Sequence, residues 1–128
     1  MKKNVLLSTL WIFLVVNFIF CDVFTLHYSE NLKAFIAGEM GGMTLTQEFL
    51  LIFAIIMELS MIMILLSRVL KYKLNRILNI IIGIILTIIQ TWSLIGEKST
   101  LHYYFFSIIE IATCVSIIII ALKWKKEE

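Results

Sequence analysis

The sequence predicts an all-α membrane protein: a bundle of four transmembrane helices that run antiparallel, up and down, with both termini on the cytoplasmic side. Composition, segment length and charge placement predict this fold. Of the 128 residues, 61% are hydrophobic and 16% are charged, and the mean hydropathy is +1.00. A soluble domain is only about 45–50% apolar and about 25% charged, and a small domain cannot hide such an excess in its core. We therefore expect a single membrane domain over residues 1–128.

Four apolar segments are long enough to cross a bilayer, which takes roughly 20 helical residues. Because lipid offers the backbone no hydrogen bonds, a helix is expected despite the many β-branched isoleucines. The expected spans are residues 5–26, 47–67, 74–95 and 101–122. We interpret the first as an uncleaved helix, because Phe18–Cys21 holds bulky side chains where signal-peptide cleavage needs small ones.

The orientation follows from the placement of Lys and Arg, which favour cytoplasmic loops. Lys33 and Lys98 fall in the parts expected outside. The other nine fall in the parts expected inside: Lys2, Lys3, Arg68, Lys71, Lys73, Arg76, Lys123, Lys125 and Lys126. This bias predicts one fixed topology, N-in and C-in, in the inner (cytoplasmic) cell membrane.

The loop between the first two spans predicts a short amphipathic helix at the outer membrane interface, over residues 30–37. Its apolar residues follow i, i+3, i+4 spacing: Leu32, Phe35 and Ile36. Gly38 and the pair Gly41–Gly42 are expected to end it and let the chain turn. The run Thr44–Gln47 then fits a capping box for the second span.

Two acids lie near the middle of apolar spans, Glu58 in the second and Glu110 in the fourth. A carboxylate at this depth is costly if it faces lipid, so we expect both to face the bundle interior. If the two face each other, like-charge repulsion makes a shared proton or a bound cation the natural state.

Other polar residues are expected to converge on these acids in the outer half of the bundle. The third span carries a polar stripe at helical spacing: Arg76, Asn79, Gly83, Thr87, Gln90, Ser93 and Glu97. The candidate binding residues are Glu58, Glu110, Gln90, Asn17, Asp22 and Tyr103, with His102 also near the outer end. The alternative is that such side chains only join helices, at about 1 kcal/mol each or less, an interpretation that we favour for Asn17, Thr87, Ser93 and Ser107.

Several classes of site lack support in the sequence. The net charge of +2 gives no indication of nucleic-acid binding. Cys21 and Cys114 lie far apart with no CxxC pattern, so we expect free thiols in apolar surroundings. No cofactor, metal site or catalytic residue is expected, and no nucleophile–base motif supports an intramembrane enzyme.

Five stretches of the chain resemble a family of small bacterial four-helix membrane proteins known only as a domain of unknown function. They are Cys21–Tyr28, Met40–Met43, Phe53–Glu58, Leu66–Lys73 and Leu101–Glu110. The resemblance covers most of the chain and implies the four-helix architecture, but it carries no activity or site. The layout is also distantly similar to DoxX-type bundles, which is an analogy of fold alone.

Two functions remain open from the sequence. The first is the binding of a proton, a cation or a small polar or lipidic ligand at the Glu58/Glu110 centre, with a homodimer needed for a substantial transport path. The alternative is a non-catalytic accessory subunit of a membrane complex, in which the acids serve helix packing or pair with a partner's Lys or Arg. Membrane lipids are the expected partners, with a homodimer or a membrane-protein partner as further possibilities.

Overall fold

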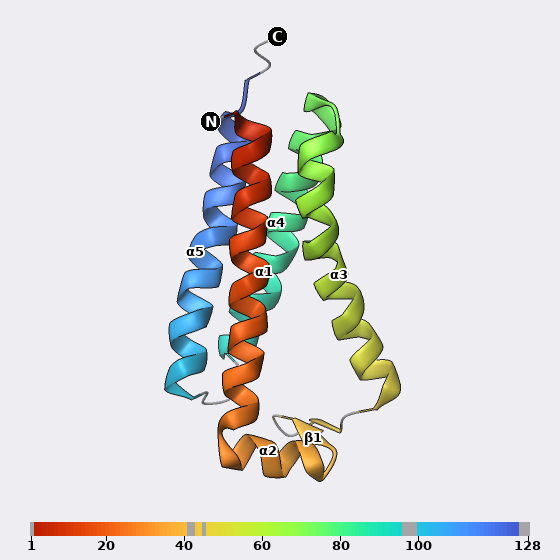
Figure 1. Ribbon diagram of the computed structural model, residues 1–128, viewed down its shortest axis with the longest axis vertical. Helices are drawn as coiled ribbons and strands as arrows, with labels where there is room; N and C mark the ends of the chain where they lie inside the picture. The colour runs from red at the N-terminus through yellow and green to blue at the C-terminus, as the bar shows by residue number, and fades with distance from the viewer. Residues whose placement is uncertain (1, 41–42, 45, 96–99, 126–128) are drawn as a thin grey trace.

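The computed structural model describes residues 2–40, 43–44, 46–95 and 100–125, and within them it contains five helices and one short hairpin (Figure 1). The elements in chain order are α1 (Lys3–His27), α2 (Ser29–Ile36), β1 (Glu39–Met40), β2 (Met43–Thr44), α3 (Gln47–Val69), α4 (Tyr72–Ile95) and α5 (Leu101–Lys123). Four of these helices are long and apolar enough to cross a membrane. The predicted helical fold with four helices of spanning length is confirmed, and each of these helices begins and ends within a few residues of the bounds expected for a span.

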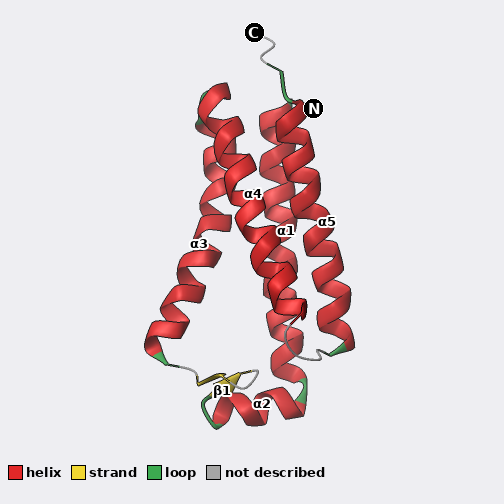
Figure 2. Ribbon diagram, turned by 180° about the vertical axis from the view of Figure 1, so that it is seen from behind, coloured by secondary structure: helices red, strands yellow, loops and turns green. Residues whose placement is uncertain are grey.

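The four long helices do not pack equally. Helix α1 packs against both α3 and α5, and α4 packs mainly against α5. Figures 1 and 2 show the N-terminal half of α3 standing apart from the other long helices. The buried residues of α3 all lie in its C-terminal half: Ser60, Met63 and Ser67. The start of α1 and the end of α5 lie at one end of the molecule, whereas α2 and the hairpin lie at the other.

The connection between α1 and α3 contains more structure than expected. Helix α2 starts one residue before the predicted range and ends at Ile36, one residue before the predicted end, and Gly38 follows at a φ of 83°. This left-handed conformation, which favours glycine, lets the Gly38 N–H donate to the Phe35 carbonyl at 3.0 Å. The chain then forms an unpredicted antiparallel hairpin, in which Glu39 pairs with Thr44. The predicted turn at Gly41–Gly42 lies outside the described residues.

The predicted capping box was placed two residues too early. Thr46 is the N-cap of α3, and its Oγ1 accepts a hydrogen bond from the Phe49 N–H at 3.1 Å. Thr44 cannot take this role because it lies in β2. The start of α3 at Gln47 is as predicted, because Thr46 is itself a good capping residue.

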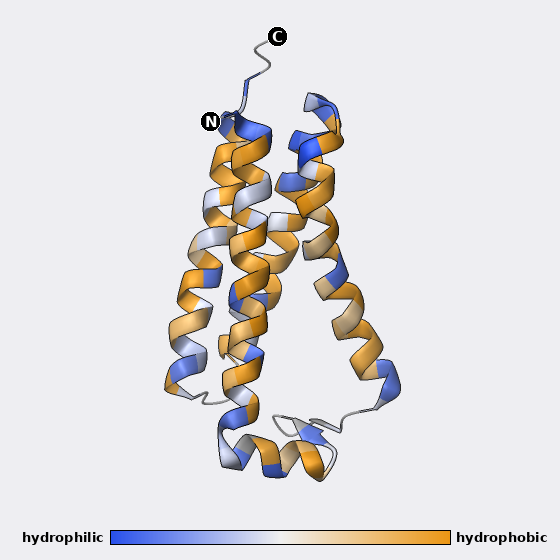
Figure 3. Ribbon diagram, in the orientation of Figure 1, coloured by the Kyte–Doolittle hydropathy of each residue, from blue (hydrophilic) through white to orange (hydrophobic). Residues whose placement is uncertain are grey.

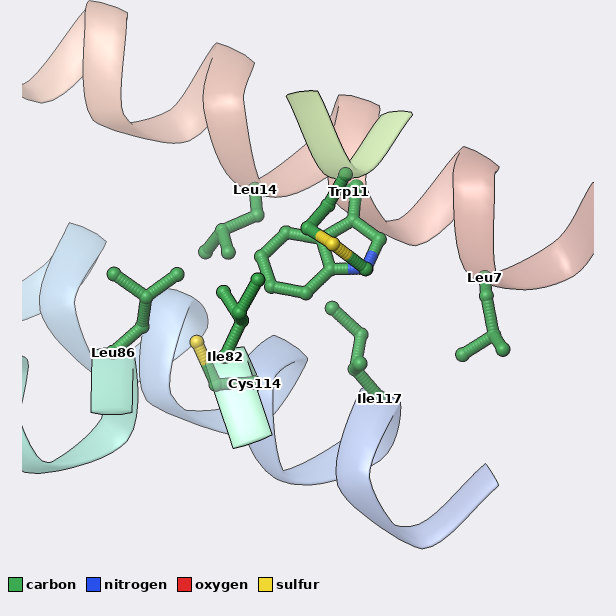
Figure 4. Packing of buried hydrophobic residues seen from close by; sticks show 8 residues of the cluster. Leu7, Trp11, Leu14, Ile82, Leu86, Cys114 and Ile117 are labelled. Atoms are coloured by element: carbon green, nitrogen blue, oxygen red, sulfur yellow. The ribbon is translucent and has the colours of Figure 1, made fainter. Parts of the chain in front are cut away.

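Residues from all four long helices form the hydrophobic core (Figure 4). The buried cluster consists of Leu7, Trp11, Leu14, Met63, Ile82, Leu86, Cys114 and Ile117. Figure 4 shows the Trp11 ring reaching from α1 toward Ile82 and Ile117. Figure 3 shows that hydrophobic residues also cover most of the length of the four helices, with hydrophilic residues gathered near their ends. This pattern fits helices whose outer faces contact lipid.

Candidate functional site

Glu110 is the buried acid of the bundle. Its side chain is 1% exposed in the middle of α5, and its Oε2 has no hydrogen-bond partner among the described residues. A buried polar atom without a partner is costly, and native structures contain few of them. Glu110 is therefore the described acid whose burial the structure does not compensate, which makes it the residue to consider first as a candidate site.

Hydrogen bonds join α4 and α5 between Glu110 and the end of the bundle where α5 begins. Gln90 Nε2 donates to Ser107 Oγ at 2.7 Å. Tyr103 donates through its hydroxyl to Ser93 Oγ, also at 2.7 Å, and Ser93 Oγ donates to the Gln90 carbonyl. Because Tyr103, Ser107 and Glu110 follow steps of four and three residues, they lie on one face of α5. The structure thus places Gln90 and Tyr103 on the same helix pair as Glu110, and a role of these two residues in binding stays a prediction.

Helix α1 supplies the third side of this region. Cys21 is buried on α1, directly before Asp22. Asp22 is exposed toward the α2 end of α1, and its charge is close enough to act on Glu110. Thr25 Oγ1 lies 3.2 Å from His102 Nε2 and so joins α1 to the start of α5.

Asn17 is buried one helical turn from Cys21, but its amide is used within its own helix. Its Nδ2 donates to the Phe13 carbonyl at 2.8 Å. This bond satisfies one N–H donor of the Asn17 side chain within α1. A role of Asn17 in ligand binding stays a prediction.

The expectation that both mid-span acids face the bundle interior is wrong for Glu58, whose side chain is exposed. Helix α3 packs on α1 through the face that carries Ser60 and Met63. Because a helix turns about 100° per residue, Glu58 points about 200° away from Ser60, nearly opposite to the packed face. Glu110 therefore has Asp22, and not Glu58, as its acidic neighbour.

A second polar network, toward the end of the bundle that holds the termini, was largely missed from the sequence. Trp11 Nε1 donates to Asn79 Oδ1 at 2.7 Å, and Asn79 Nδ2 donates to Asn75 Oδ1. Asn75 Nδ2 in turn donates to the Ser67 carbonyl at 2.7 Å. All four side chains are buried. The spacing of four residues between Asn75 and Asn79 was the available signal. These groups bond to one another, so the network joins α1, α3 and α4.

The described residues contain no group of three or more His, Cys, Asp or Glu side chains placed to hold a metal ion. Cys21 and Cys114 are both buried free thiols. Among the described residues, Asp22 is thus the charged neighbour of Glu110.

The whole chain, residues 1–128, matches the sequence model of a family described as "Family of unknown function (DUF6326)". The chain belongs to this family. The match confirms the resemblance to a small membrane family of unknown function. No curated protein and no solved structure matches the chain. Its function must therefore be inferred from its own residues.

Proposed function

We propose that this family member is a multi-pass protein of the cytoplasmic membrane that binds a proton or a small cationic ligand at Glu110. Its helices run antiparallel, up and down, with both termini in the cytoplasm. The nine-to-two distribution of Lys and Arg supports this orientation. The start of α1 and the end of α5 lie at the same end of the molecule, which is consistent with it.

The observation that carries the proposal is the buried Glu110 Oε2 without a partner. Placing a charged acid at the centre of a membrane helix costs about 2.5–3.5 kcal/mol on insertion scales. Every Lys and Arg of the sequence lies near or beyond the end of a span, so none sits at the depth of Glu110. A proton or a cation from outside the chain must therefore neutralise this group.

Access from the outer side is provided by Asp22. It is exposed on α1, close enough to interact electrostatically with Glu110, and next to buried Cys21. A cation at the outer surface would meet Asp22 first and Glu110 second. Neutral groups on α4 and α5, among them Tyr103 and Gln90, would line its path.

Infrared spectroscopy of the purified protein in lipid tests proton binding directly, because a protonated carboxyl has its own C=O stretch. We expect a carboxyl band in the wild type with a component from buried Glu110, and this component should disappear in Glu110→Gln. The matched control is Glu58→Gln, which removes the other mid-span acid and should leave the Glu110 component in place, whatever Glu58 itself contributes to the band. A Glu110→Gln spectrum that has lost no component of the band would overturn the assignment.

Cation binding is tested with tetraphenylphosphonium as the probe, by measuring proton release in weakly buffered solution. Wild-type protein should release a proton on adding the probe, and Glu110→Gln should not. If the two proteins share the same infrared spectrum and neither releases a proton, Glu110 binds neither a proton nor a cation, and the proposal is wrong.

A further inference from the structure

Glu58 is a charged side chain exposed in the middle of a candidate span. It lies at the midpoint of α3, which runs from Gln47 to Val69. The other exposed charged residues that the structure describes on the four spans, such as Asp22 and Arg68, lie toward helix ends, where water and headgroups are near. An acid that faces hydrocarbon at the bilayer centre is costly, and such residues are normally paired or covered by protein.

The exposed face of α3 that contains Glu58 has the spacing of a coiled-coil seam. Steps of 4, 3, 4, 3 and 4 residues connect Leu51, Ile55, Glu58, Ile62, Leu65 and Val69. The five apolar members are between 42% and 65% exposed. This repeat keeps one stripe facing a partner helix along its whole length. We call these six residues the α3 seam.

The acid distinguishes the α3 seam from the lipid-facing stripes of the other helices. The equivalent exposed stripe of α1 is apolar throughout: Ile12, Val16, Ile19 and Val23. Such a stripe is satisfied by lipid, whereas Glu58 is not. The N-terminal half of α3 also stands apart from the other long helices (Figures 1 and 2).

We propose that a second copy of this chain covers the α3 seam, so that two α3 helices pack in parallel with Glu58 facing the partner's Glu58. Copies inserted with the same fixed topology are related by a two-fold axis along the membrane normal, which makes their α3 helices parallel. In a parallel seam, equivalent positions face each other.

The chemistry of this pair is self-complementary. One Glu58 carboxyl that keeps its proton donates an O–H hydrogen bond to the carboxylate of the other, which is a short, charge-assisted bond. The pair then holds one negative charge in place of two. A single polar pair in an apolar seam also sets the register of the two helices. A second copy offers no Lys or Arg at this depth, so the shared proton is what makes it a fitting partner.

The dimer needs no rearrangement of the chain. Ser60 and Met63 keep their contacts with the rest of the bundle on the opposite face of α3. The α3 seam is also separate from the buried Glu110 site, so this proposal does not rest on the proposed function.

Cysteine cross-linking in the membrane tests the geometry. Leu51→Cys and Ile62→Cys lie on the α3 seam, and the matched controls Ile52→Cys and Met61→Cys each lie one residue off it with comparable exposure. With an oxidant such as copper phenanthroline, both seam variants should form disulfide dimers on non-reducing gels, several-fold more than the controls. The wild type, whose two cysteines are buried, reports the background. Equal cross-linking on and off the seam would overturn the proposal.

Energy transfer between differently labelled copies in lipid vesicles tests the role of the acid. Glu58→Leu should weaken dimerisation about tenfold, the effect of one interhelical polar contact. Glu58→Gln should retain the dimer, because an amide pair both donates and accepts, and Glu110→Gln should dimerise like the wild type. A monomeric wild type, undiminished dimerisation of Glu58→Leu, or a stable complex with another chain that carries Lys or Arg opposite Glu58 would each overturn the proposal.

Discussion

Trp11 and Asn79 join the first and third spans through a 2.7 Å hydrogen bond between two fully buried side chains. Asn79 Oδ1 accepts from the indole Nε1, and Ser67 Oγ on α3 reaches the same oxygen at a longer 3.4 Å. Three helices thus share one amide. In lipid, where apolar contact gives little drive for helices to associate, such shared polar contacts help to fix which helices are neighbours.

Trp11→Phe should lower the free energy of unfolding by about 1 kcal/mol, the usual size of an interhelical hydrogen bond in lipid. The substitution keeps an aromatic ring in the core but removes the N–H, so Asn79 Oδ1 is left with the longer Ser67 bond. Unfolding in SDS, followed by circular dichroism, measures the change. Trp92→Phe is the matched control because Trp92 is 77% exposed. An equal loss in both variants would contradict the prediction.

Ser8 and Ser60 should respond oppositely to the same substitution. Both are buried, but Ser8 Oγ donates to the Ile64 carbonyl at 2.8 Å, whereas Ser60 Oγ has no partner among the described residues. Ser8→Ala should cost about 0.5–1 kcal/mol, while Ser60→Ala should be neutral or stabilising, because it removes a hydroxyl whose desolvation is uncompensated. The SDS unfolding midpoints of the two variants check the sign, and a clear loss in Ser60→Ala would reveal an unrecognised partner.

Arg76 should hold the last turn of α5 in place. Its Nε and Nη2 donate to the carbonyls of Ala121 and Leu122 at 2.9 and 3.0 Å. These carbonyls lie at a helix C-terminus, where acceptors are left over and a cation interacts favourably with the helix dipole. Arg76→Lys cannot reproduce the two-pronged contact, so amide hydrogen exchange should accelerate over residues 118–125.

The control for Arg76 is Lys73→Gln, which removes an exposed charge from the same end of α4. It should leave exchange in α5 unchanged. Equal acceleration in both variants would show that net charge, and not the hydrogen bonds of Arg76, protects the helix end.

The four spans could be predicted because each depends on the length and mean hydropathy of a long segment and on the charges at its ends, and these quantities average over many residues. The inward face of α4 could also be predicted, since polar and small residues mark one stripe there: Asn79 and Gly83 are buried, and Gln90 is half-buried.

Which face of α3 packs against the bundle could not be predicted in this way. Apolar residues surround Glu58 on every side, so no stripe indicates which face packs. Depth alone suggested that Glu58 points inward, but depth does not fix the rotation of a helix. Asn75 was overlooked because it lies near a span end, where a polar residue is expected.

Gly83 should be required for the close packing of α4 against α5. A Cβ at this position would lie 2.8 Å from Ile118 Cγ1, closer than real side chains approach. Gly83→Ala should therefore destabilise the wild type, because overpacking costs about 1–3 kcal/mol and outweighs the gain in helix propensity of up to about 1 kcal/mol. In an Ile118→Ala background the clash is gone, and the same substitution should become stabilising. SDS unfolding of the four proteins in this double-mutant cycle measures the reversal. If Gly83→Ala costs the same in both backgrounds, contact with Ile118 is not the reason for glycine at this position.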